Sequence, residues 1–283
     1  MKAVLVLLFG FLLAGQVTAA DRVVSEYAYN QLTRVHELIE ENRHEQALKR
    51  LQKLRPTDTR RYEQALVQQT YGYLYAAREE YGLAIEAFEK CLALSVLPPT
   101  ARKNTLYNLA QLQLASGDVT RAIVTLEQWF KLETQATPQA HALAGTAYAQ
   151  VKRYAEAIKH LQQAIAAGSE APETWYRQLL AVYYDAARYK AAARLLEQMT
   201  QQFPQRKAYW LQLSSVYRRL QDDAKSLAVL ELAYQQGLLT SERELTELAD
   251  YYLYMDMPYQ AGKRLDKALR EGAVSSTSQH WRL

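Results

Sequence analysis

Side chains that could perform chemistry are few in this 283-residue sequence, and none belongs to a recognisable catalytic motif. The histidines are His36, His44, His141, His160 and His280, and the single cysteine is Cys91. There is no HExxH pair, Walker phosphate loop, GxGxxG turn or GxSxG nucleophile turn. His36 and His44 are eight residues apart across a predicted turn, which matches no metal-binding motif. We therefore expect no catalytic residue, no cofactor and no metal site.

The stretch from Pro138 to Ala171, which includes His141 and His160, indicates the secondary structure in which such residues lie. It fits two short amphipathic helices joined by a turn at Val151-Lys152-Arg153. Counted from Pro138, the residues at positions 8, 11, 20, 24 and 27 are Gly145, Tyr148, Ala157, Leu161 and Ala164. Small residues recur at the position of Ala157 with spacings of 37, 38, 35, 35, 34 and 35: Ala47, Ala84, Ala122, Ala157, Ala192, Ser226 and Ala261. This spacing predicts seven helix–turn–helix repeats.

This pattern resembles the tetratricopeptide repeat over residues 28–275. The predicted repeats lie near residues 28–61, 65–98, 103–136, 138–171, 173–206, 207–240 and 242–275, within a solenoid spanning 21–275. We expect small residues at positions 8 and 20, where the two helices approach closely, and larger residues in the gaps. The resemblance implies an all-α, right-handed superhelix of helix pairs. Cys91 falls at position 27, so we expect a packed thiol.

The resemblance also implies a concave groove, lined by the first helix of each pair, that binds peptides or extended protein segments. Carried onto this chain residue by residue, the family's groove positions give a polar and aromatic set with a basic end. The set is Tyr73, Asn104, Tyr107, Asn108, Gln111, Thr146, Gln150, Arg177, Gln178, Tyr184, Ser215, Arg218 and Arg219. Asn108 matches one position of the family's carboxylate clamp, but the lysines of that clamp are missing, so we do not expect capture of a C-terminal carboxylate.

Several local signals mark where the helices begin and end. Thr137-Pro138 is typical of an N-cap followed by proline at the first helical position. Ser241 and Glu244 predict a capping box. Gly117-Asp118 predicts an internal turn, and Pro98-Pro99 predicts a helix break.

Composition favours an ordered interaction protein. Hydrophobic residues make up 49% of the chain, with only 10 Gly and 7 Pro, which excludes a loop-rich or disordered polypeptide. The formal net charge is +4, and basic residues alternate with acids along the predicted helices, so nothing indicates a nucleic-acid partner. One cysteine cannot form a disulfide framework within the chain.

Residues 1–20 have the pattern of a secretory signal peptide. Lys2 is followed by an apolar run from Ala3 to Ala14, and small residues precede a predicted cleavage site after Ala19 or Ala20. The run is shorter than the roughly 20 residues that span a bilayer, so we expect no membrane span in the mature chain. We expect a periplasmic protein with a flexible tail at residues 276–283.

These observations favour a periplasmic protein–protein interaction scaffold, without enzymatic activity, that binds an extended segment of an envelope partner. Its organisation resembles the exported repeat proteins that accompany TonB–ExbB–ExbD systems, which implies a TonB- or ExbB-type inner-membrane partner. Two alternatives stay open. One is an assembly factor for secretion, pilus or polysaccharide-export machinery. The other, of a different class, is a cell-wall enzyme or its accessory protein.

Overall fold

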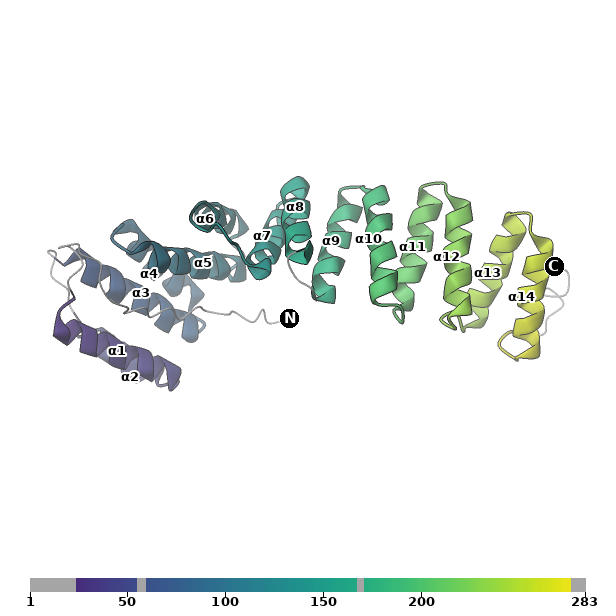
Figure 1. Cartoon of the computed structure of the whole chain (residues 1–283). Coiled ribbons are helices and arrows are strands. Elements are labelled where there is room, and N and C mark those ends of the chain that lie inside the picture. The colour runs from purple at the N-terminus through teal and green to yellow at the C-terminus, as the bar shows by residue number, and fades with distance from the viewer. Residues whose placement is uncertain (1–23, 55–59, 167–170, 276–283) are drawn as a thin grey trace. The chain divides into compact units, whose positions relative to one another are not determined.

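The structure, a computed structural model, describes residues 24–54, 60–166 and 171–275, and the described residues form α-helices joined by short turns (Figure 1). The predicted signal segment and tail lie outside these ranges. The helices are α1 (Glu26–Glu40), α2 (His44–Leu51), α3 (Arg61–Ala77), α4 (Tyr81–Ala93), α5 (Pro99–Ala115), α6 (Val119–Leu132), α7 (Pro138–Gln150), α8 (Tyr154–Ala166), α9 (Glu173–Asp185), α10 (Tyr189–Gln202), α11 (Lys207–Arg219), α12 (Asp223–Gln235), α13 (Glu242–Tyr254) and α14 (Pro258–Arg270). Successive helices pair into seven hairpins, which confirms the predicted all-α repeat fold.

The hairpins belong to two units. The first, Met1–Gly168, contains α1–α8, and the second, Ser169–Leu283, contains α9–α14. Within the first unit, α2 packs on α3, α4 on α5 and α6 on α7, so each hairpin stacks on the next. Within the second unit, α10 packs on α11 and α12 on α13 in the same way. Neighbouring hairpins thus bury the faces that a single hairpin would expose.

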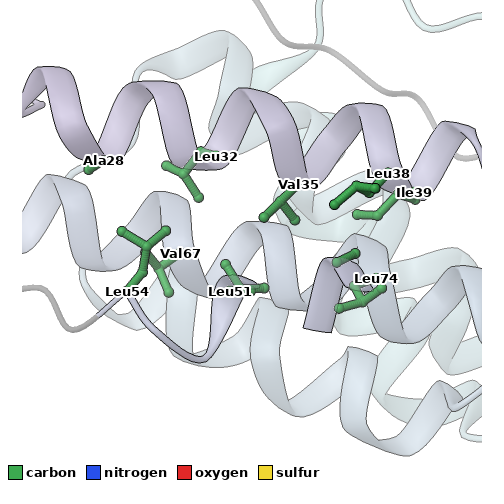
Figure 2. Packing of buried hydrophobic residues seen from close by; sticks show 10 residues of the cluster. Ala28, Leu32, Val35, Leu38, Ile39, Leu51, Leu54, Val67 and Leu74 are labelled. Atoms are coloured by element: carbon green, nitrogen blue, oxygen red, sulfur yellow. The ribbon is translucent and has the colours of Figure 1, made fainter. Parts of the chain in front are cut away.

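The first hairpin shows how the apolar pattern produces this stacking. Leu32 and Val35 of α1 are buried together with Leu51 of α2 and with Val67 and Leu74 of α3 (Figure 2). Burying each such side chain contributes on the order of 1.5–3 kcal/mol. The core therefore includes residues of the following hairpin, and the first hairpin depends on its neighbour.

A left-handed residue ends the first helix of every hairpin. These residues have φ between 52° and 85°, and they are Asn42, Glu79, Gly117, Lys152, Ala187, Gln221 and Asp256. The next residue donates its N–H to a carbonyl five residues earlier, as Arg153 does to Tyr148 at 2.9 Å, which satisfies a carbonyl at the helix end. Each left-handed residue lies five positions before the small residue of its repeat, so the turns follow the spacing found in the sequence.

The small residues at position 20 are buried in all seven hairpins, with exposed fractions of 0–2%. Position 8 needs glycine in two hairpins mainly because a large side chain of the facing helix fills the space where a Cβ would lie. A Cβ added to Gly72 would lie 2.5 Å from the Phe88 ring, and one added to Gly145 would lie 2.6 Å from Leu161 Cγ. The carbonyl oxygen of Ala157 is farther away, at 3.2 Å. The residue at position 24 therefore sets the size limit at position 8.

The helix ends confirm three of the local signals and revise the fourth. Thr137 caps α7 ahead of Pro138, Ser241 and Glu244 form the capping box of α13, and Asp118 caps α6 after the Gly117 turn. At Pro98-Pro99 the prediction was only partly right. Helix α4 ends earlier, at Ala93, and Pro99 is the first residue of α5, where the missing N–H costs nothing. Helices α3 and α5 begin four residues before the predicted repeats and have 17 residues each.

Tyrosines at position 11 join one hairpin to the next. Tyr148 Oη donates to Glu127 of α6 at 3.0 Å, and Tyr252 Oη donates to Glu231 of α12 at 2.8 Å. Burial, together with the neighbouring carboxylate, raises the pKa of both tyrosines to about 12. These rings pack in the core while their hydroxyl groups bind a carboxylate of the preceding hairpin.

Candidate functional site

Four of the predicted partner-binding residues lie on one face of α5. Asn104, Tyr107, Asn108 and Gln111 are separated by three, four and seven positions from the first, the spacing of a single helical face. Asn104 and Tyr107 are half-buried, whereas Asn108 and Gln111 are buried. The Tyr107 ring lies against Trp129 of α6, with 5.2 Å between centroids, and burial raises the pKa of Tyr107. This face is polar but is largely enclosed by its neighbours.

Gln111 is the member of this face with an unused donor. Its Nε2 is buried and has no hydrogen-bond partner among the described residues. Leaving a buried donor unsatisfied costs about 1–3 kcal/mol. Gln113, two residues later, donates its Nε2 to Glu89 at 3.4 Å. An incoming carbonyl oxygen could supply the missing hydrogen bond once neighbouring side chains moved to expose this atom.

Tyr73 and Asn108 connect two helices of the first unit. Asn108 Nδ2 donates to Tyr73 Oη at 3.5 Å, and the Tyr73 ring meets the Phe88 ring edge-on at 5.3 Å. Both residues are buried, and burial raises the pKa of Tyr73 to about 12. These two predicted groove residues therefore join α3 to α5 in this structure, and they do not present their side chains to solvent.

The two predicted residues of α7 are placed differently from each other. Thr146 is half-buried, and its hydroxyl donates to the carbonyl of Ala142 at 2.9 Å within the helix. Gln150 is exposed at the last position of α7. No described contact joins either of them to the polar face of α5.

In the second unit most predicted residues are exposed on α9 and α11. The exposed residues are Arg177, Gln178, Ser215, Arg218 and Arg219, and Tyr184 is half-buried. The Arg219 guanidinium lies 4.4 Å from the centre of the Tyr189 ring, a cation–π distance. The Tyr184 ring meets the same tyrosine at 6.3 Å. Tyr189, which the sequence analysis did not include, thus brings Tyr184 and Arg219 together.

This part of the second unit carries a surplus of positive charge. Residues 173–219 contain eight basic and three acidic residues, whereas residues 220–275 contain six basic and ten acidic residues. A shallow hollow of about 470 Å³ is lined by Arg188, Tyr189, Lys190, Arg194 and Leu220, among others. No described carboxylate pairs with these three cationic side chains or with Arg219. Their charge is therefore available to an acidic ligand.

A pair of histidines that the sequence analysis did not single out lies in the fourth hairpin. His141 Nδ1 of α7 and His160 Nδ1 of α8 are 3.0 Å apart. Phe130 of α6 packs against both rings, and Tyr148 stacks on His160. Burial, followed by the nearby His141 and Lys159, lowers the pKa of His160 to about 4, and burial also lowers the pKa of His141.

The described ranges contain no group of three or more His, Cys, Asp or Glu residues arranged to hold a metal ion. They also contain no helix that is long and apolar enough to cross a bilayer. Cys91 is buried, as predicted, and burial raises its pKa to about 12.

Two family models match the chain. One is described as anaphase-promoting complex, cyclosome, subunit 3, and matches residues 77–164. The other is described as tetratricopeptide repeat and matches residues 148–215. The chain therefore contains tetratricopeptide repeats. Members of this scaffold family typically bind proteins or peptides and have no enzymatic activity. No curated protein matches the sequence.

Several solved repeat structures are similar to this tetratricopeptide-repeat chain in fold. A tetratricopeptide repeat protein from Parabacteroides merdae is 12% identical, with a TM-score of 0.51 over 91% of this chain and 97% of that one. YrrB, described as a protein with an unusual peptide-binding site, is 15% identical, with a TM-score of 0.50 over 71% and 91%. A chain of the Naa15/Naa10 complex bound to HypK-THB is 14% identical, with a TM-score of 0.60 over 87% and 37%. At these identities the similarity shows the fold alone.

Proposed function

We propose that this protein is an exported, non-catalytic scaffold that holds an extended segment of a partner in the cell envelope. The observation that carries the proposal is the buried Nε2 of Gln111 on the polar face of α5, which has no hydrogen-bond partner among the described residues. An extended segment presents backbone carbonyl oxygens that need donors when they leave water. A carbonyl placed at Nε2 would offset the cost of that buried donor. YrrB, a repeat protein of similar fold, is described as having an unusual peptide-binding site, which is consistent with this proposal.

The second unit indicates the charge of the partner segment. The surplus of basic residues on α9–α11, together with the unpaired cations around Tyr189, favours a segment that carries Asp or Glu. Opposite charges across an interface speed association and select against partners of the same charge. We therefore infer that the partner segment is extended and contains an acidic stretch.

The proposed compartment and system come from residues 1–20. A basic start, a short apolar run and small residues before Asp21 support export and cleavage. Within the periplasm, the partner we favour is a periplasmic segment of a TonB- or ExbB-type inner-membrane protein. N-terminal sequencing of the protein from a periplasmic fraction tests export, since it should begin at Ala20 or Asp21. An intact Met1 in the cytoplasm would overturn this part of the proposal.

The partner is tested by crosslinking the native chain in envelope extracts and identifying the captured proteins by mass spectrometry. TonB- or ExbB-type proteins are the expected result. Recovery of secretion, pilus or polysaccharide-export subunits would replace the TonB proposal with the assembly role. Hydrolysis of cell-wall material by the purified protein would overturn the non-catalytic scaffold.

A pair of variants tests the role of Gln111. Gln111→Leu removes the unpaired donor, so it should keep or raise the unfolding free energy while the crosslinked partner is recovered at least about tenfold less. Gln113→Leu is the matched control, because that amide is already bonded to Glu89. It should lower stability by about 1–3 kcal/mol. Unchanged recovery of the partner by folded Gln111→Leu would show that this amide does not bind it.

A further inference from the structure

We propose that His141 and His160 form a binding site for a divalent transition-metal ion of the Zn²⁺, Ni²⁺ and Cu²⁺ class. The two imidazoles come from the facing helices α7 and α8 of one hairpin, and their Nδ1 atoms are 3.0 Å apart. Imidazole nitrogen is a preferred ligand of these ions, whereas Mg²⁺ and Ca²⁺ prefer oxygen. The chemistry of the pair therefore selects the class of ion.

The separation of the two nitrogens suits a shared ion. Zn²⁺ lies about 2.0–2.1 Å from a histidine nitrogen, so two nitrogens on one ion are about 2.8–3.0 Å apart at a right angle and about 3.3–3.4 Å apart at a tetrahedral angle. The observed 3.0 Å matches the right angle, and a tetrahedral angle needs about 0.3 Å of further separation. Without metal, the same atoms share one hydrogen bond in which one Nδ1–H donates to the other Nδ1. To bind one ion, each ring must rotate until both lone pairs point to a common position.

The surroundings hold both rings in place. The Phe130 ring centroid lies 5.3 Å from that of His141 and 4.9 Å from that of His160. On the other side, Tyr148 stacks on His160 at 5.5 Å, and its hydroxyl is fixed by Glu127. Ligands whose motion is already restricted lose less conformational freedom when the ion arrives. This aromatic enclosure distinguishes the pair from two histidines that merely share a surface.

The pair is also open to solvent, and charged side chains of both signs lie near it. Both histidines are half-buried, so an ion and its remaining water ligands can reach them. Glu156 lies one helical turn before His160, but its carboxylate is paired with Arg153 at 2.7 Å. Lys159, whose charge acts on both rings, opposes a cation. We therefore infer an open site with two protein nitrogens and water in the other positions. It shares no residue with the proposed partner-binding surfaces.

The test is a titration of the untagged mature chain with Zn²⁺ by calorimetry, and with Cu²⁺ by electron paramagnetic resonance. The wild type should bind one Zn²⁺, and the Cu²⁺ spectrum should show coupling to two nitrogens. His141→Gln and His160→Gln should each weaken Zn²⁺ binding at least about tenfold and leave one coupled nitrogen. Mg²⁺ should not bind at the pair.

Two controls make the result decisive. His44→Gln removes a histidine of another hairpin, and His280→Gln removes the one near the C-terminus; neither should change the Zn²⁺ affinity. Far-UV circular dichroism shows whether each variant is folded, and Phe130→Leu, which keeps both ligands but loosens their enclosure, should weaken binding by a smaller factor. Equal Zn²⁺ binding by the wild type and by a folded His141→Gln/His160→Gln chain would overturn the proposal.

Discussion

Replacing Gly72 by alanine tests how the hairpins of this chain are packed. A Cβ at this position of α3 would lie 2.5, 2.6 and 2.7 Å from three carbon atoms of the Phe88 ring. Carbon atoms in contact are normally about 3.5–4.0 Å apart, so the ring would have to move by roughly 1 Å. Phe88 is fully buried and has little room to move. Over-packing of this kind costs about 1–3 kcal/mol, while alanine gains about 1 kcal/mol over glycine within a helix.

Gly72→Ala should therefore lower the unfolding free energy by up to about 2 kcal/mol. Gly82→Ala on α4 is the matched control, because a Cβ there meets no atom within 4 Å, and it should raise the unfolding free energy by about 0.5–1 kcal/mol. Urea unfolding followed by circular dichroism measures both. Adding Phe88→Leu to Gly72→Ala should cost less than Phe88→Leu costs in the wild type. If Gly72→Ala stabilised the chain as much as Gly82→Ala, contact with the ring would not be the reason for glycine.

Three further predictions concern single side chains. Burial lowers the pKa of His36 to about 4 in the folded chain, below the usual value of about 6.5. The stability that the neutral His36 contributes to the folded chain is therefore complete above pH 6.5 and is lost as the pH falls from 6.5 to 4. In His36→Gln, the unfolding free energy should therefore change less between pH 6.5 and pH 4 than in the wild type, by up to roughly 3 kcal/mol. Ala187→Gly should raise the thermal unfolding midpoint, because alanine at φ 52° is strained, and a lower midpoint would contradict this. Tyr252→Phe should cost about 1.5–3 kcal/mol in urea unfolding by removing the hydrogen bond to Glu231, and unchanged stability would show that this bond contributes nothing.

The repeat framework could be predicted from sequence because a few small residues determine it. Alanine or serine at position 20 permits close approach of two helices, and glycine at position 8 accepts the large side chain at position 24. Ala157 and Gly145 show both requirements within one hairpin. The extra turn at the start of α5 was not predicted, because proline both ends helices and begins them. Pro99 begins α5, and this could be told from a proline that ends a helix only by knowing that α4 already ends at Ala93.

The candidate site was harder to predict, because a repeat position specifies a helix face but not how deeply that face is covered. Asn108 and Gln111 are on the same face of α5 and are both buried. Yet Asn108 donates to Tyr73 while Gln111 Nε2 has no described partner. The difference depends on which side chain the neighbouring helix places opposite each amide. In the second unit, Tyr189 likewise has no groove position in the repeat, and it joins the site only because the turn before α10 places it beside Arg219.

Side-chain pairs between facing helices were easier to predict, because the repeat register alone could have identified some of them. Tyr148 bonds Glu127, and Tyr252 bonds Glu231, each across the same separation of 21 residues. A tyrosine at position 11 with a glutamate 21 residues earlier is therefore a pattern that predicts a bond between hairpins. His141 and His160 occupy positions 4 and 23 of their repeat, on the two helices that face each other. The proposed metal site therefore lies at two positions that the repeat register brings face to face, so such histidine pairs can be found from sequence once the register is known.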